Sequence, residues 1–73
     1  MMPLSLANAD EPQIIRRIGG NPEAKRHLED LGFTVGAEVR IVSAFGGNLI
    51  VRIRDSRVAV SIELAGKIMV YRF

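Results

Sequence analysis

Residues 38–62 form three consecutive runs in which apolar and polar side chains alternate, with short polar turns between the runs. A period of two residues is typical of strands that bury one face, because successive side chains of a strand point to opposite sides of the sheet. The pattern therefore predicts an antiparallel three-stranded meander whose inward side chains share one core. The inward set is Val39, Ile41, Phe45, Leu49, Val51, Ile53, Val58, Val60 and Ile62.

Two turns determine how these predicted strands align. A three-residue Gly46-Gly47-Asn48 loop would place Phe45 opposite Leu49, with both side chains facing inward. A two-residue Asp55-Ser56 turn would align the next two runs in the same way, apolar against apolar. Both turns thus agree with one buried face.

A helix with a well-defined start precedes the meander. Asn21 is a good N-cap, Pro22 fits the first helical position, and Glu23 complements the partial positive charge of the helix N-terminus. Helical spacing then produces one apolar stripe, which consists of Ala24, Leu28 and Leu31.

The end of this helix is equally well defined. Gly32 fits the left-handed C′ position of a Schellman motif, and Phe33 at C″ can then pack on Leu28. Gly36 follows and opens the alternating runs of the meander. We therefore predict structural roles for Asn21, Gly32, Phe33 and Gly36.

The remaining segments read as strands and turns. Residues 12–18 predict a strand with imperfect alternation and a bulge. Near the N-terminus, Leu4 and Leu6 have the spacing of a strand. Residues 63–66 predict a short turn, and residues 67–73 predict the last strand.

The length of 73 residues predicts a single domain covering residues 1–73. Short twisted strands with one helix can bury a core at this length only if the sheet curls nearly shut. We therefore expect a mainly β fold, a small SH3-like barrel of five to six strands. The helix is inserted between strands 1 and 2, which are the strand at residues 12–18 and the first strand of the meander.

Composition favours a soluble cytoplasmic protein. Cysteine is absent, whereas small secreted domains usually need disulfides. No apolar run approaches the roughly 18 residues of a membrane span, and the N-terminus lacks a signal pattern. The formal net charge is only +2, but residues 36–73 hold six basic and three acidic side chains.

Four stretches of the chain resemble the ferrous iron transport protein A family, the FeoA-type domain. They are PLSL, IIRRIGG, LEDLGFTVGAEVRIV and LIVRIRDSRVAVSIELAGKIMV. The most specific part is Leu31-Gly32-Phe33-x-x-Gly36-x-x-Val39, followed by Ile68-x-Val70. The chain departs from the family's pattern at Ala9-Asp10-Glu11, where the family commonly has a glycine.

The resemblance implies an SH3-like barrel and a function in bacterial or archaeal ferrous iron uptake. The implied role is that of a small cytosolic accessory or regulatory protein. Its implied partner is a membrane ferrous iron transporter with a cytosolic GTP-binding domain, which would hold the protein at the inner face of the membrane. A related domain is also appended to metal-dependent repressors.

A metal site has only weak candidates. His27 is the one histidine, and Glu23 and Asp30 lie on the same side of the helix. A single imidazole without a thiolate is a poor donor set for zinc or ferrous iron, and the carboxylates suit ordinary helix pairs. We therefore expect no metal site and no cofactor.

Catalysis and nucleic-acid binding are also disfavoured. The serines lack a histidine partner, and the paired glycines suit turns better than a phosphate cradle. We therefore expect no enzyme activity and no small-molecule substrate. The aromatic residues do not interleave with basic ones, which argues against nucleic acid as a partner. A small nucleic-acid-binding barrel that uses outward-facing arginines stays the alternative interpretation.

The outward face of the meander holds the candidate partner-binding residues. The expected register places Arg54 opposite both Arg40 and Arg57, and these arginines border a small apolar patch. Solvated arginines would be an ordinary surface, but a basic rim around an apolar patch also suits an acidic segment of a protein partner. The patch consists of Val42, Ala44, Ile50 and Ala59. The candidate residues are Arg40, Val42, Ile50, Arg52, Arg54 and Arg57.

Overall fold

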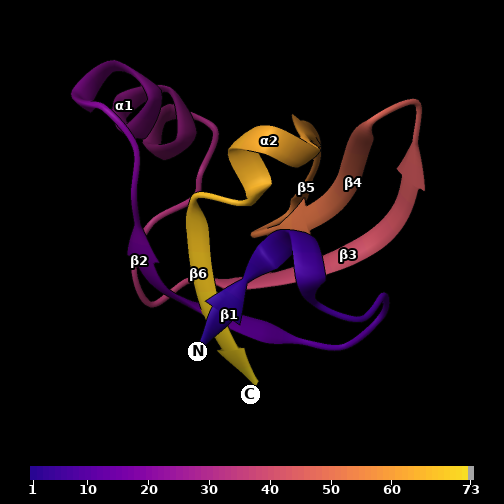
Figure 1. The fold of residues 1–73 in the computed structure, drawn as a ribbon. Helices are drawn as coiled ribbons and strands as arrows, with labels where there is room; N and C mark the ends of the chain where they lie inside the picture. Colours follow the sequence, from indigo (N-terminus) through magenta and orange to yellow (C-terminus); the bar gives the residue numbers. More distant parts are fainter. Residues whose placement is uncertain (73) are drawn as a thin grey trace.

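The computed structural model describes residues 1–72, and strands make up most of its regular structure (Figure 1). Six strands form one antiparallel sheet in the order β1-β6-β2-β3-β4-β5. They are β1 (Met2–Pro3), β2 (Gln13–Ile18), β3 (Glu38–Phe45), β4 (Asn48–Ile53), β5 (Ser56–Ser61) and β6 (Ile68–Arg72). The sheet curls around its inner face, which confirms the predicted small mainly β barrel.

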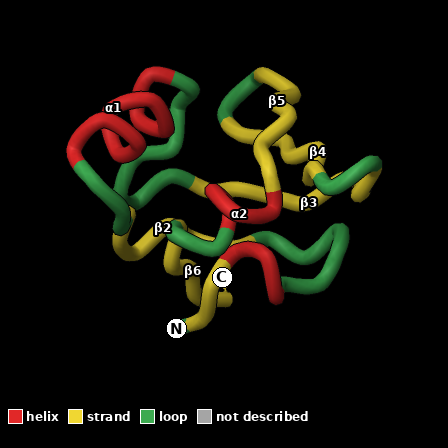
Figure 2. The backbone as a smooth tube through the Cα atoms, turned by 45° about the horizontal axis from the view of Figure 1, so that its top comes forward, coloured by secondary structure: helices red, strands yellow, loops and turns green. Residues whose placement is uncertain are grey.

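Helical segments connect the strands at three places. Helix α1 (Pro22–Asp30) lies between β2 and β3, η1 (Leu4–Leu6) follows β1, and α2 (Ile62–Ala65) lies between β5 and β6. Helix α1 is thus inserted where we predicted it, although the two-residue β1 makes its flanking strands the second and third. Figure 2 shows α1 at one side of the molecule and α2 near its middle. No helix within residues 1–72 is long and apolar enough to cross a membrane.

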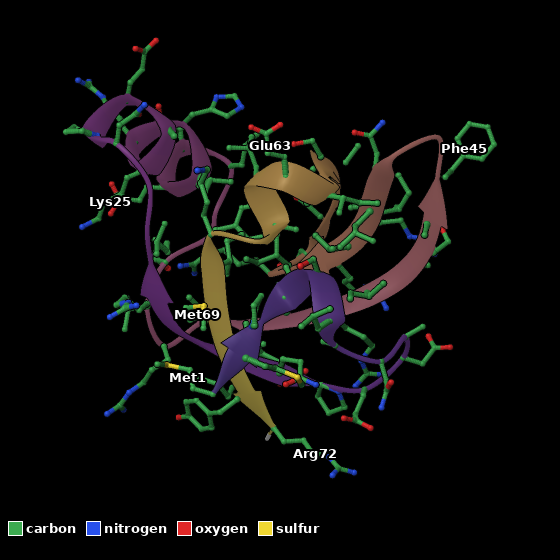
Figure 3. The ribbon with its side chains drawn as sticks, in the orientation of Figure 1. Met1, Lys25, Phe45, Glu63, Met69 and Arg72 are labelled. Atoms are coloured by element: carbon green, nitrogen blue, oxygen red, sulfur yellow. The ribbon has the colours of Figure 1, made fainter. Side chains whose placement is uncertain are left out.

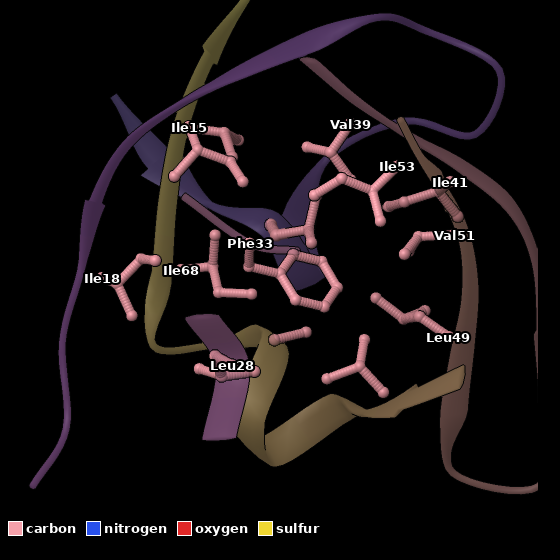
Figure 4. Packing of buried hydrophobic residues seen from close by; sticks show 14 residues of the cluster. Ile15, Ile18, Leu28, Phe33, Val39, Ile41, Leu49, Val51, Ile53 and Ile68 are labelled. Atoms are coloured by element: carbon pink, nitrogen blue, oxygen red, sulfur yellow. The ribbon is translucent and has the colours of Figure 1, made fainter. Parts of the chain in front are cut away.

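The core fills the inside of the curled sheet. Figure 4 shows the Phe33 ring in the middle of the cluster, and Phe33, Leu4 and Leu28 are fully buried there. Burying a side chain of this size stabilises the fold by about 1.5–3 kcal/mol relative to exposing it. The buried apolar residues are Leu4, Ile15, Ile18, Leu28, Phe33, Val39, Ile41, Leu49, Val51, Ile53, Val60, Ala65, Ile68 and Val70.

Both ends of α1 have the predicted geometry. The Asn21 side chain accepts a hydrogen bond from the Ala24 N–H at 2.8 Å. At the other end the Phe33 N–H donates to the Leu28 carbonyl at 3.0 Å, and the Gly32 N–H donates to the Glu29 carbonyl at 2.9 Å. These two bonds define a Schellman motif, and Gly32 has the required left-handed conformation, with φ 108°.

The first turn of the meander differs from the prediction. Gly46 and Gly47 alone form it, with φ values of 57° and 80°. Positive φ at both central residues is the type I′ conformation, which suits a two-residue hairpin turn. As a result Phe45 lies opposite Asn48 rather than Leu49.

The second turn begins one residue earlier than predicted. Arg54 and Asp55 form it, and Ile53 therefore lies opposite Ser56. The predicted Asp55-Ser56 turn was wrong by one residue, which changes the alignment of the two strands by two. Because side chains alternate with a period of two, a change of two residues leaves every side chain of β4 and β5 on its predicted face.

A β-bulge in β3 has a larger effect on the meander. The ladder with β4 shifts between Ile41 and Ser43, so Val42 is the extra residue of β3. One extra residue reverses the face of every side chain that follows it. Phe45, which we expected in the core, is 80% exposed, and Ala44 lies opposite the buried Leu49.

The N-terminal segment corrects another expectation. Leu4 and Leu6 belong to the 3₁₀ helix η1, not to a strand. The tighter helical path buries Leu4 completely and leaves Leu6 70% exposed. Only Met2–Pro3 pairs with the sheet, on β6.

The segment between β5 and β6 is also helical. Ile62, which we expected on the inward strand face, begins α2 and is 45% exposed. The Ser61 side chain caps this helix by accepting a hydrogen bond from the Leu64 N–H at 3.1 Å. Strand β6 then ends at Arg72, and Phe73 lies outside the described residues.

Candidate functional site

The outward face of strands β3, β4 and β5 carries three arginines side by side. Arg40 lies opposite Arg52, and Arg52 lies opposite Arg57 on the next strand. We call these three residues the arginine row. All three are exposed. The expected pairing of Arg54 with Arg40 and Arg57 was wrong, because Arg54 belongs to the turn.

Little inside the protein balances the charge of this row. Glu38 approaches Arg40 at 3.9 Å, but both side chains are about half exposed, so this pair contributes little. Within residues 1–72, neither Arg52 nor Arg57 forms an ion pair. Like charges that face each other across strands are destabilising, so the fold itself gains nothing from this arrangement.

Arg54 extends the basic surface by a different route. It is the first residue of the β4–β5 turn and has the left-handed conformation, with φ 56°. Its Nη2 donates a hydrogen bond to Thr34 Oγ1 at 2.9 Å, in the segment that follows α1. A left-handed conformation is uncommon for a residue with a long side chain, and such outliers often occur at functional positions.

A shallow surface pocket brings these groups together. Three of its lining side chains are guanidinium groups, and one is a carboxylate. Guanidinium groups can bind a carboxylate or another planar anion through two parallel hydrogen bonds. The pocket can therefore receive one acidic side chain. Its lining residues are Ala37, Glu38, Arg40, Arg52 and Arg54.

The apolar patch next to the row has a different composition from the one we expected. Ile50 is half-buried and lies between Ser43 and Ala59 on its neighbouring strands. Val42 is the half-buried residue of the bulge. Ala44 does not belong to this face, because the bulge turns it towards the Leu49 side.

Phe45 lies at the far end of the same outward face. It is at the tip of the β3–β4 hairpin, and Figure 3 shows its ring pointing away from the rest of the molecule. At 80% exposure it is the most exposed of the large apolar residues within residues 1–72. Sequence reasoning missed Phe45 and Thr34 as surface residues of interest, and only a predicted bulge in β3 could have indicated the first.

The weak metal-ligand candidates lie on a separate surface. His27, Glu23 and Asp30 line a shallow pocket between α1 and Leu64 of α2. Within residues 1–72, however, no three histidine, cysteine or acidic side chains are grouped closely enough to hold a metal ion.

The chain is similar to proteins of one family. The family model described as the FeoA domain matches residues 2–72. A candidate Fe(2+) transport protein A from Methanocaldococcus jannaschii is 30% identical over 70 residues, which cover 96% of this chain and 85% of that protein.

Solved structures are similar over almost the whole chain. A crystal structure described as the iron uptake regulatory protein FeoA has a TM-score of 0.90 at 29% identity, covering 99% of this chain and 96% of that one. The zinc-complexed FeoA of Stenotrophomonas maltophilia, described as a prokaryotic SH3 domain protein, has a TM-score of 0.79 at 28% identity, covering 97% and 91%. A manganese-dependent transcriptional repressor has a TM-score of 0.87 at 20% identity, with 40% of its chain covered, and this likeness concerns the fold alone.

Proposed function

Because this chain belongs to the FeoA domain family, we propose that it is a cytoplasmic accessory protein that regulates ferrous iron uptake by docking on a membrane transporter with a cytosolic GTP-binding domain. Its family is associated with ferrous iron transport. A regulatory role agrees with the name of one similar protein, an iron uptake regulatory protein. In this proposal the protein reaches the inner face of the membrane through its partner and catalyses no reaction itself.

The observation that carries the docking proposal is the arginine row. Three facing cations with only the exposed Glu38 as an internal counter-charge are unfavourable for the isolated chain, and a partner with acidic side chains would relieve their repulsion. The pocket beside the row offers a place for one carboxylate. Ile50 and the protruding Phe45 add apolar contact area to the same face, as the centre of a protein interface requires.

Capture of the purified, detergent-solubilised transporter by the tagged protein tests this proposal. Arg40→Glu combined with Arg52→Glu reverses two charges of the row, and we expect at least a tenfold loss of capture with an unchanged circular dichroism spectrum. Arg16→Glu combined with Arg17→Glu is the matched control, because these exposed arginines lie on β2 and the change in net charge is the same. Equal losses for both variants would point to net charge rather than to this face.

The alternative partner for an arginine surface is nucleic acid. Titration with a generic duplex DNA and a generic single-stranded RNA at two salt concentrations separates the two functions, because phosphate contacts weaken steeply with salt. We expect no binding at physiological ionic strength. Tight, salt-sensitive binding that the Arg40→Glu and Arg52→Glu variant loses would favour the nucleic-acid function.

A further inference from the structure

Strand β5 forms a free edge of the sheet. The order of strands places β1 at one edge and β5 at the other. Edge strand β1 has only two residues, whereas β5 has six, Ser56–Ser61. Within residues 1–72, the ladder with β4 accounts for all the strand pairing of β5, and no hydrogen bond reaches its outer side.

The register identifies the backbone groups that point away from β4. Residues that flank a two-residue hairpin turn bond to each other, so Ser56 bonds to Ile53 across the turn. Bonded pairs alternate along an antiparallel ladder, and Val58 and Val60 therefore bond to β4 as well. The backbone N–H and C=O groups that point to the free edge therefore belong to Arg57 and Ala59, since Ser61 is the N-cap of α2 and its C=O accepts the first hydrogen bond of that helix.

This edge lacks most of the devices that keep edge strands from pairing. Strand β5 contains no proline, no lysine and no bulge, and Arg57 is its one charged residue. An exposed edge of this kind can accept an extended peptide as an additional strand. The free edge of β5 is therefore a candidate site for pairing with another chain.

The charge and burial of β5 indicate the chemistry of that occupant. The arginine row ends at Arg57, so a strand added beyond β5 would place one of its own side chains beside this guanidinium. A carboxylate there would be an opposite-charge cross-strand neighbour. On the other face Val58 is only partly buried, and an apolar side chain of the added strand would cover it.

We infer that the free edge of β5 binds an extended segment of the transporter in which acidic and apolar residues alternate. The inference rests on the proposed function and specifies how the partner is held. A second copy of this chain is a poor occupant, because β5 contains no acidic residue that could face Arg57. The acidic positions of the segment lie on the same face as the arginine row, and the apolar positions lie on the face of Val58 and Val60.

Ala59→Pro tests the edge directly. Proline removes the N–H that points to the free edge but leaves the bonds of Val58 and Val60 to β4 in place. Ala59→Val is the matched control, because it adds comparable side-chain volume and keeps the N–H. With the purified, detergent-solubilised transporter, we expect Ala59→Pro to reduce capture at least tenfold more than Ala59→Val does.

Hydrogen exchange of the unmodified protein provides a second test that does not depend on how the proline variant folds. On binding the transporter, the amides of Arg57 and Ala59 should exchange at least tenfold more slowly, while Val58 and Val60 change little because they are already bonded. Docking through side chains alone would not produce this alternation.

The possible outcomes distinguish a failure of the edge assignment from a failure of the proposed function. Undiminished capture by a folded Ala59→Pro variant, or unchanged exchange at Arg57 and Ala59, would overturn the edge assignment alone. A dimer of the parent chain that Ala59→Pro dissociates would also overturn it, since the occupant would then be a second copy. Failure of the parent chain to capture the transporter would overturn the proposed function and this inference together.

Discussion

Arg54 in the β4–β5 turn donates a hydrogen bond to Thr34 after α1, at 2.9 Å and across 20 residues of sequence. This bond joins the turn to the segment that leads into β3. It is exposed, so its net contribution to the stability of the fold is small. The left-handed backbone of Arg54, with φ 56°, opposes that contribution. Stability therefore does not explain an arginine at this position.

Arg54→Gly should stabilise the protein. Glycine adopts a positive φ without a steric penalty, so we expect the free energy of unfolding in urea to rise by about 1 kcal/mol. Thr34→Val is the control, because it removes the hydrogen bond and leaves the backbone of residue 54 unchanged. We expect that variant to stay within about 0.5 kcal/mol of the parent. A destabilised Arg54→Gly variant would mean that the Arg54–Thr34 contact outweighs the backbone strain.

Gly32 and Gly36 should both be sensitive to any Cβ atom, for a backbone reason. Their φ values are 108° and 91°, and a Cβ on Gly32 would only touch Ile53 and Arg54 at 3.8 Å and 4.0 Å. A Cβ on Gly36 would meet nothing within 4 Å. We therefore expect Gly32→Ala and Gly36→Ala each to lower the free energy of unfolding by on the order of 1 kcal/mol, and Gly32→Val by more. If only Gly32→Ala destabilises the fold, local packing rather than backbone strain decides the cost.

The two phenylalanines Phe33 and Phe45 should respond in opposite ways to the same truncation. Phe33 is fully buried, so Phe33→Ala should cost about 3–5 kcal/mol, which is enough to unfold a domain of this size. Phe45 is 80% exposed, and Phe45→Ala should leave the melting temperature within a few degrees of the parent. A large loss of stability in Phe45→Ala would place this ring in the core and contradict the bulge in β3.

The arginine row should make the fold less stable than it could be. Arg52→Thr removes both facing pairs at once and introduces a residue that favours strands, so we expect a gain of a few tenths to about 1 kcal/mol. The gain should shrink at high salt, which screens exposed charges. Arg17→Thr on β2 is the control, because Arg17 lies opposite Met69 rather than another cation. Equal gains for the two variants would attribute the effect to strand propensity alone.

Zinc should bind only weakly to this chain. His27 is the single imidazole, and Glu23 and Asp30 share its surface without forming a metal site with it. We expect isothermal titration with Zn²⁺ at neutral pH to give no stoichiometric heat at micromolar concentrations. A sub-micromolar site that His27→Ala abolishes would show that the three side chains rearrange around the ion.

Local interactions made much of the fold predictable. The start of α1 depends on Asn21 and its neighbours, and the end of α1 depends on Gly32 and Phe33, which bond within one or two turns of the same helix. The candidate site was predictable only in part. Arg40, Arg52 and Arg57 lie on the expected outward face, because alternation fixes a face wherever a strand is regular.

The amino-acid sequence by itself determined the strands β2 to β6, where α1 begins and ends, and that one face of the meander is buried, but not the short β1 and η1. Only the tertiary structure decided which residues face each other. A shift of two residues preserves the alternation, so the sequence pattern cannot distinguish the register with Arg54 opposite Arg40 from the one with Arg52 there. Likewise, the bulge at Val42 is a feature of the pairing between β3 and β4, and it moves Phe45 from the predicted core to the surface. The free edge of β5 follows from the order of the strands, which depends on packing among segments distant in sequence.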